Sequence, residues 1–198
     1  MSFHPAGLMV AALLLFAPGA GAAADECADC HGKDGASTES DVPVIGGVSE
    51  QYLIDSMSAY RDSKRPCAKT AYRAGDKKRP KTDMCEIAGK LSAEDTAKVA
   101  KTLAGKAFVK AKQPFDAGKA ATGKKVHDTA CEKCHSEGGS LAEDEAGILA
   151  GQWLPYLKET FAQYTKGARP QPEKMKVKFN ALKPEEQEAL LHYYASQQ

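Results

Sequence analysis

The sequence CADCH, Cys27 to His31, returns as CEKCH, Cys131 to His135, and this pair decides how the chain is interpreted. Cys-x-x-Cys-His is the signature of covalent c-type haem attachment. In each copy two thiols bond the porphyrin, and a helical turn places the histidine on the same face, within reach of the iron. We therefore expect two covalently bound haem c groups. The attachment cysteines would be Cys27, Cys30, Cys131 and Cys134, and the axial ligands His31 and His135.

Two other uses of paired cysteines explain the pattern less well. A redox Cys-x-x-Cys motif needs neither the histidine nor a second copy. A structural zinc site places its cysteine pairs much closer together in sequence than these two pairs lie.

The repeat extends well beyond the two motifs. At their offset of 104 residues, the matched pairs are Gly47 with Gly151, Tyr52 with Tyr156, and Tyr60 with Tyr164. Further along the chain the offset falls to 91, which pairs Met84 with Met175 and Leu91 with Leu182. The apolar spacing between these markers is helical in both halves. We therefore expect an all-α protein with one haem domain at residues 25–108 and another at residues 109–198.

The amino terminus predicts export. Residues 8–17 (LMVAALLLFA) form an apolar run of about ten residues, and a membrane-spanning helix needs roughly 20. Small residues follow it, with Ala-x-Ala at Ala22 and Ala24. We interpret residues 1–24 as a signal peptide and expect a periplasmic mature chain without a membrane span. The net charge of the whole chain is +1, which argues against nucleic-acid binding.

The sixth iron ligands are predicted to be methionines. His31 is the only histidine in residues 25–126, so the first half offers no second imidazole. Met84 and Met175 are paired by the repeat, and each is expected in a loop that precedes the last helix of its half by a similar distance. A thioether ligand raises the reduction potential, which suits a one-electron carrier. The residues that we assign to packing or structural roles instead are Met57, His127 and His192.

Cys67 and Cys85 lie outside the motifs. In an oxidising compartment we expect them to form a disulfide, which closes a loop of about 19 residues and stabilises the protein by roughly 3 kcal/mol. Two alternatives are a cysteine thiolate as a ligand of the first iron, and free or intermolecular thiols.

A basic segment at residues 61–81 surrounds Cys67. It carries nine basic and two acidic residues, a net charge of +7, while the rest of the chain carries −6. It is either a solvated loop or a docking patch for an acidic partner, which would accelerate association. Nucleic acid is an unsuitable partner, because Tyr72 is the only aromatic residue of this segment and bases stack on aromatic side chains.

Three stretches of the sequence resemble the two-haem cytochrome subunit of flavocytochrome c sulfide dehydrogenase: residues 125–139 (KVHDTACEKCHSEGG), 148–157 (ILAGQWLPYL) and 193–198 (YYASQQ). The likeness is close over residues 119–198 and weaker, though collinear, over residues 25–118. It implies two tandem class I cytochrome c domains related by a pseudo-twofold axis, with their haems close together. It also implies His/Met ligation of both irons, by His31 with Met84 and by His135 with Met175.

The resemblance implies a partner as well. In that family the cytochrome subunit docks on an FAD-bearing subunit that oxidises sulfide, and electrons leave to a periplasmic acceptor. This chain has no dinucleotide-binding fingerprint, so we expect it to be the electron-transfer subunit of a heterodimer, without catalytic residues of its own. Two alternatives stay open. One is a free-standing two-haem cytochrome c that shuttles electrons to a terminal oxidase, and the other is a dihaem thiosulfate-oxidising enzyme that uses Cys67 or Cys85 at the iron.

Overall fold

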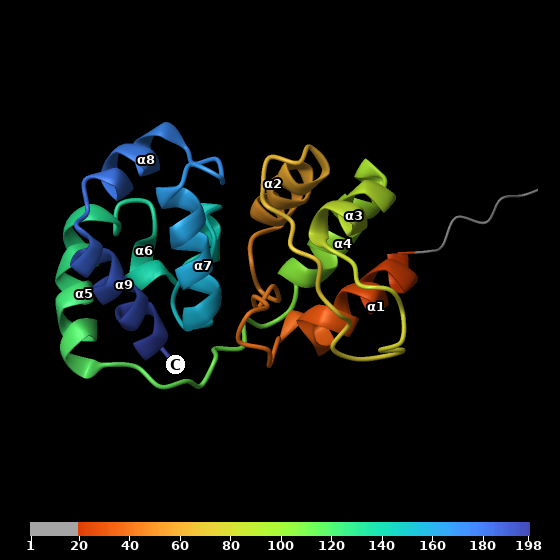
Figure 1. Ribbon diagram of the computed structural model, residues 1–198, viewed down its shortest axis with the longest axis horizontal. Helices are drawn as coiled ribbons and strands as arrows, with labels where there is room; N and C mark the ends of the chain where they lie inside the picture. Colours follow the sequence, from red (N-terminus) through yellow and green to blue (C-terminus); the bar gives the residue numbers. More distant parts are fainter. Residues whose placement is uncertain (1–19) are drawn as a thin grey trace, which may run out of the picture.

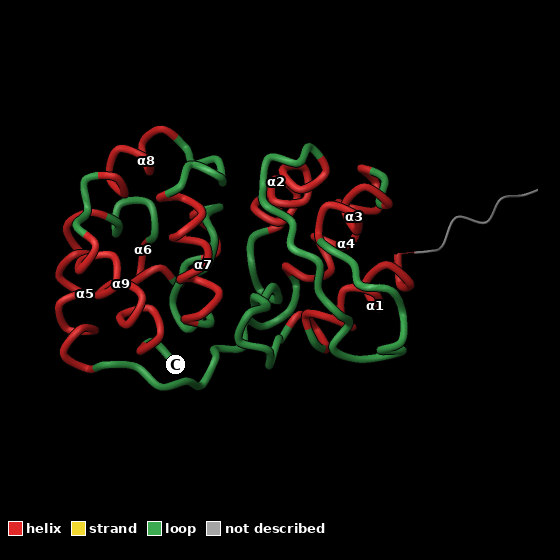
Figure 2. Tube along the Cα trace, in the orientation of Figure 1, coloured by secondary structure: helices red, strands yellow, loops and turns green. Residues whose placement is uncertain are grey.

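The computed structural model describes residues 20–198, and every regular element in that range is a helix (Figures 1 and 2). The elements of the first half are α1 (Ala20–His31), η1 (Lys33–Gly35), α2 (Glu50–Arg61), α3 (Met84–Lys90) and α4 (Ala93–Ala104). Those of the second half are α5 (Ala117–Ala130), α6 (Ser136–Gly139), η2 (Ala142–Asp144), α7 (Leu154–Thr165), α8 (Glu173–Asn180) and α9 (Pro184–Ser196). The all-α prediction is confirmed. Most of the expected signal peptide lies outside the described residues, and its last five residues begin α1.

Local sequence signals set the starts of the two terminal helices. The Ser92 hydroxyl accepts a hydrogen bond from the main-chain N–H of Asp95 at 3.0 Å, and so caps α4 as its sequence predicts. Pro184 stands at the first position of α9, where its missing N–H costs nothing. The Glu186 carboxylate accepts from the Lys183 N–H at 2.8 Å and completes the start of that helix.

The two halves repeat the same main-chain hydrogen bonds. The N–H of Gly47 donates to the carbonyl of Leu103 at 2.9 Å, and the N–H of Gly151 donates to that of Tyr194 at 2.8 Å. Donors 104 residues apart thus meet acceptors 91 residues apart, the two offsets found in the sequence. Both glycines have a φ of +73°, a left-handed conformation that glycine adopts without strain. The structure therefore confirms the internal repeat.

Each half has its own apolar core. The cluster of the second half comprises Leu157, Phe161, Phe179, Leu190, Leu191, Tyr193 and Tyr194. In that half α5 and α9 cross so closely that a Cβ atom on Gly123 would lie 2.1 Å from a main-chain oxygen of Ala189. The cluster of the first half comprises Val48, Leu53, Val99, Ala100 and Leu103, together with Ile148 from the second half. The two cores are thus joined.

Hydrogen bonds also cross between the halves, where α2 and α7 face one another (Figure 1). The buried Gln152 side chain accepts from the Val44 N–H and donates to the Val44 carbonyl, both at 2.9 Å. The Trp153 indole donates to the carbonyl of Ser37 at 2.9 Å. These bonds fix the relative position of the two halves. In the part of the chain described, no helix combines the length and apolarity that a membrane crossing requires.

Candidate haem sites

The first motif lies in the last two turns of α1, which carries Cys27, Cys30 and His31 together. The Nδ1 atom of His31 lies 2.9 Å from the carbonyl oxygen of Pro43, so the ring donates its Nδ1–H there. This bond orients the imidazole and leaves Nε2 as the nitrogen with a free lone pair. Burial lowers the pKa of His31, which favours the neutral ring that binds a metal.

The second motif follows the end of a helix instead of lying within one. Cys131 is the C-cap of α5, and its carbonyl accepts from the N–H groups of Cys134 and His135, both at 3.0 Å. This tight turn keeps the cysteines and the histidine on one side of the chain. Burial lowers the pKa of His135 as well. Cys134 is exposed, whereas Cys30 in the first motif is partly covered.

A buried polar network supports the second motif. His127 is fully buried; its Nδ1 lies 3.0 Å from the Tyr194 hydroxyl and its Nε2 lies 2.6 Å from the Glu132 carboxylate. The Tyr194 hydroxyl is also hydrogen-bonded to Cys131. Burial raises the pKa of the Cys131 thiol, and this hydrogen bond opposes the rise. Since His127 holds two neighbours of Cys131, its contacts agree with the structural role expected from its sequence position.

The two candidate methionines occupy the same place in each half, on the short helix before the last one. Met84 is the first residue of α3, whose N-cap Asp83 accepts from the N–H of Glu86 at 2.8 Å. Met175 lies in the first turn of α8, and both side chains are half-buried. The sequence predicts loops at these positions. The structure has helices there because an N-cap aspartate and Pro172, respectively, start the helix just before each methionine.

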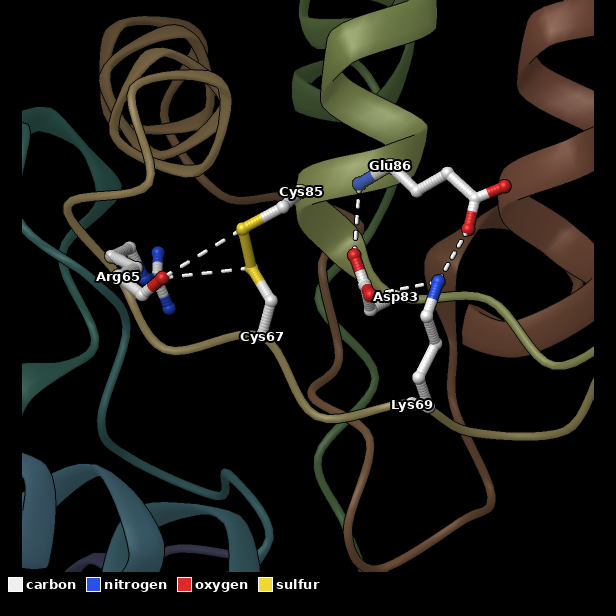
Figure 3. Close-up of a disulfide and its surroundings, with 6 residues drawn as sticks. All are labelled: Arg65, Cys67, Lys69, Asp83, Cys85 and Glu86. Carbon is white, nitrogen blue, oxygen red and sulfur yellow. Dashed lines mark hydrogen bonds and ion pairs between the residues drawn. A yellow bond between two sulfur atoms is a disulfide. The ribbon is translucent and has the colours of Figure 1, made fainter.

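Cys67 and Cys85 are joined by a disulfide, with their Cα atoms 5.9 Å apart (Figure 3). Both sulfur atoms lie beside the carbonyl oxygen of Arg65, at 3.5 and 3.8 Å. In this arrangement neither sulfur is a thiolate. Lys69 adds ion pairs to Asp83 at 3.1 Å and Glu86 at 2.6 Å, so the disulfide and these pairs fasten the basic segment to the start of α3.

Two buried arginines complete the sites, and the sequence analysis did not recognise them as functional. Arg65 and Arg169 are 7 % and 6 % exposed. They are related by the offset of 104, which is the signal that could have found them. Each guanidinium lies over a tyrosine ring from its own half, Arg65 over Tyr60 at 4.2 Å and Arg169 over Tyr164 at 5.0 Å.

The Arg169 guanidinium reaches across to the first half. Its Nη2 donates to the Tyr52 hydroxyl at 3.1 Å, and its Nη1 donates to Thr160 at 3.2 Å. Although burial alone would raise it, the positive charges of Arg169 and Arg65 lower the pKa of Tyr156 to about 8. The boundary between the halves is therefore strongly electropositive.

Neither arginine has an anionic partner within residues 20–198. No carboxylate there forms an ion pair with either guanidinium, and the buried Nε of Arg65 has no hydrogen-bond acceptor. Burying an unpaired cation is costly, so this pair indicates a missing anion. Haem carries two propionate carboxylates, which suit two paired guanidinium groups. The donor set of thiols, imidazoles and thioethers also suits haem iron, so the residues present fit two haem c groups.

Similarity to known proteins places the chain in a family. The cytochrome c family model matches residues 16–104. Cytochrome c4 from Azotobacter vinelandii is 32% identical over 150 residues, which cover 72% of this chain and 69% of that protein. The chain belongs to the dihaem cytochrome c4-like family. Cytochrome c4 from Pseudomonas aeruginosa is 29% identical over 154 residues, covering 72% of this cytochrome and 68% of the relative.

Solved structures agree on the fold. Cytochrome c4 from Pseudomonas stutzeri has a TM-score of 0.70 at 22% identity, over 90% of this chain and 98% of that one. Cytochrome c4 from Acidithiobacillus ferrooxidans has a TM-score of 0.69 at 19% identity, over 87% and 99%. Thiosulfate dehydrogenase (TsdBA) from Marichromatium purpuratum has a TM-score of 0.68 at 25% identity, over 86% of this chain and 36% of that one.

The family confirms several expectations about this cytochrome. It consists of two tandem class I cytochrome c domains, it carries two covalently bound haem c groups, and it transfers electrons. The resemblance to a flavocytochrome subunit is thus confirmed at the level of the dihaem cytochrome c family.

Proposed function

We propose that this cytochrome is a periplasmic one-electron carrier with one iron site in each half. Cys27 and Cys30 would attach the first haem, with His31 and Met84 as its iron ligands. The second site has the attachment residues Cys131 and Cys134 and the ligands His135 and Met175. When bound, the two haem c groups supply reversible one-electron chemistry.

The chain's own residues hold and orient these groups. The Pro43 carbonyl fixes the His31 ring through Nδ1, which leaves Nε2 as the nitrogen that would bind the iron. The paired arginines, Arg65 and Arg169, would bind propionate carboxylates at the boundary between the halves. This boundary is the observation that carries the proposal, because propionates bound there from both halves would bring the two redox sites together for internal electron transfer.

For the electron donor, we propose a separate FAD-bearing subunit that oxidises sulfide. The support is the resemblance of residues 119–198 to the cytochrome subunit of flavocytochrome c sulfide dehydrogenase. Electrons would then leave for a periplasmic acceptor.

A second donor is favoured by the thiosulfate dehydrogenase structure, in which a region similar to this chain makes up 36% of a longer protein. On that model the chain would accept electrons from a thiosulfate-oxidising partner. A free-standing shuttle to a terminal oxidase fits the cytochrome c4 relatives equally well.

The iron ligands are tested by substitution. Met84→Ala and Met175→Ala should each remove half of the far-red charge-transfer band that methionine ligation gives to oxidised haem c, and the double variant should remove all of it. Met57→Ala is the matched control and should leave the band intact. A full band in Met84→Ala would show that another residue binds the first iron.

The donor is tested by purification from the native source. A flavin that co-elutes with the cytochrome, and haem reduction on addition of sulfide, would support the flavocytochrome. Reduction by thiosulfate in the presence of a haem-containing partner would favour the second donor. A cytochrome that elutes alone and is reduced by neither would favour the shuttle.

A further inference from the structure

The disulfide-closed loop of the first half folds onto the first haem-attachment motif. We call residues 67–85 the strap. In Figure 1 it leaves α2, runs around α1 and returns to α3. Its two arms are joined by an isolated bridge, in which Thr70 and Thr82 exchange main-chain hydrogen bonds of 2.8 and 3.0 Å. The bridge and the disulfide make its base rigid.

The middle of the strap is fastened to Asp29, which lies between the two attachment cysteines. The main-chain N–H groups of Arg73 and Ala74 donate to the Asp29 carbonyl at 2.9 and 2.8 Å. The Arg79 guanidinium pairs with the Asp29 carboxylate and stacks on the buried Tyr72 ring at 3.5 Å. The fit is tight, because a Cβ atom on Gly75 would lie 2.7 Å from an Asp29 carboxylate oxygen.

A further ion pair extends the strap beyond Asp29. The Arg73 side chain reaches Asp41 at 2.6 Å, on the loop that follows the motif. With its bonds to Asp29, the strap thus lies against the residue that precedes Cys30 and against the loop that follows the motif. A thioether to Cys30 would place a single carbon between this sulfur and the porphyrin ring, so a segment packed beside Cys30 would also lie beside that edge of the porphyrin.

These contacts also use up much of the segment's charge. Arg73, Arg79 and Lys69 pair with acidic residues, and Arg65 is buried. Arg61 donates to the main-chain oxygens of Ala88 and Leu91. Within the described chain, the strap lysines that form no ion pair are Lys77, Lys78 and Lys81. Three of the nine basic side chains, Lys69, Arg73 and Arg79, thus hold the strap in place.

The second half has no such cover. The segment between α7 and α8, residues 166–172, is 15 residues shorter than its counterpart, residues 62–83. Both Lys133 and Cys134 are exposed. On α8 next to Met175, Val177 is 62 % exposed between exposed lysines, Lys176 and Lys178. Lys178 is close enough to Cys131 that its charge opposes the rise that burial gives to the pKa of that thiol.

We propose that the strap closes the Cys30 edge of the first haem to redox partners, so that an acidic partner protein exchanges electrons at the open Cys134 edge of the second half. The proposal rests on the haem attachment proposed above. In that arrangement, electrons would enter and leave the first haem mainly through the second haem. The apolar Val177 and its flanking lysines supply the contact and the charge that an acidic partner needs.

Accessibility of each haem edge tests the strap directly. In the oxidised protein, a neutral gadolinium chelate broadens the haem methyl proton resonances that solvent reaches. Met84→Ala and Met175→Ala assign those resonances to one haem or the other. We expect the methyls beside Cys134 to broaden several-fold more than those beside Cys30.

The matched variant replaces residues 71–81 with two glycines. It keeps the disulfide and suits the paired threonines, since a two-residue turn closes an antiparallel pair. It should raise broadening beside Cys30 to the level of the second haem. Arg79→Gln should do so in part, and Lys64→Gln, which removes an exposed ion pair outside the strap, should change nothing. Equal broadening of both haems in the unaltered chain would overturn the strap's role.

The partner surface is tested by the rate of oxidation with hexacyanoferrate(III), a trianion. Replacing Lys133, Lys176 and Lys178 with Glu should slow oxidation several-fold at low salt. The same change at Lys77, Lys78 and Lys81 should alter the rate less than twofold. The reverse order would place exchange at the strap and overturn the proposal. The haem content of the same samples, from their mass, is a separate result: fewer than two haems would overturn the proposed attachment, whereas two haems with equal broadening would overturn only the strap.

Discussion

The amide of Gln152 is predicted to hold the two halves together, and Gln152→Ala is expected to separate them. Gln152 is 3 % exposed and Val44 is 2 % exposed, so water does not readily replace the lost amide. The substitution removes both 2.9 Å hydrogen bonds to Val44. A buried polar group without a partner costs about 1–3 kcal/mol, so the two main-chain groups of Val44 together cost roughly 2–6 kcal/mol.

The loss falls on the boundary between the halves and leaves each core intact. We therefore expect urea unfolding, which is a single transition when the halves are coupled, to split into two. Trp153 is the only tryptophan of the chain, and its indole donates to Ser37 of the other half. Its fluorescence should change in the earlier transition, and haem absorbance should follow the unfolding of each half.

A matched control separates this effect from a general loss of glutamine. Gln51 is exposed, and its amide donates to Asp55 within the same helix at 2.8 Å. Gln51→Ala should change the free energy of unfolding by less than about 0.5 kcal/mol. A change below about 1 kcal/mol in Gln152→Ala, with a single transition retained, would refute the argument that these buried bonds couple the halves.

Three further predictions concern stability. In thermal melts, Gly123→Ala should destabilise the second half by more than about 2 kcal/mol, because its Cβ would overlap a main-chain oxygen of α9. The control is Gly89→Ala on α3, where a Cβ meets nothing within 4 Å, and this change should be neutral or slightly stabilising. The hydrogen bond from His127 holds the pKa of Glu132 below its usual value of 4.5, so this carboxylate stabilises the fold above about pH 4.5 and loses that contribution as the pH falls through its folded-state pKa. Glu132→Gln should therefore flatten the acid limb of the stability profile, and an unchanged limb would contradict the assignment. Replacing Cys67 and Cys85 together with Ser should cost roughly 3 kcal/mol in chemical denaturation, and addition of a reductant to the unaltered protein should reproduce that loss.

The sequence determined the fold class and the haem chemistry of this protein. Covalent attachment needs two thiols and an imidazole at fixed local spacing, so Cys27, Cys30 and His31 can be recognised from the sequence alone. The internal repeat is equally local, because each half must supply its own turn glycines, such as Gly47 and Gly151, and its own last helix. Helix starts such as Ser92 follow from capping chemistry within four residues.

Only the tertiary structure decided what the charged residues do. In the sequence, Arg65 and Arg79 are two of nine basic residues in one segment, and nothing local separates them. In the fold, one is buried beside Tyr60 at the boundary of the halves, and the other pairs with Asp29, 50 residues away along the chain. Such pairings depend on which distant segments meet. An ion pair or a buried cation is therefore a property of the packed chain, whereas a haem-attachment motif is a property of five consecutive residues.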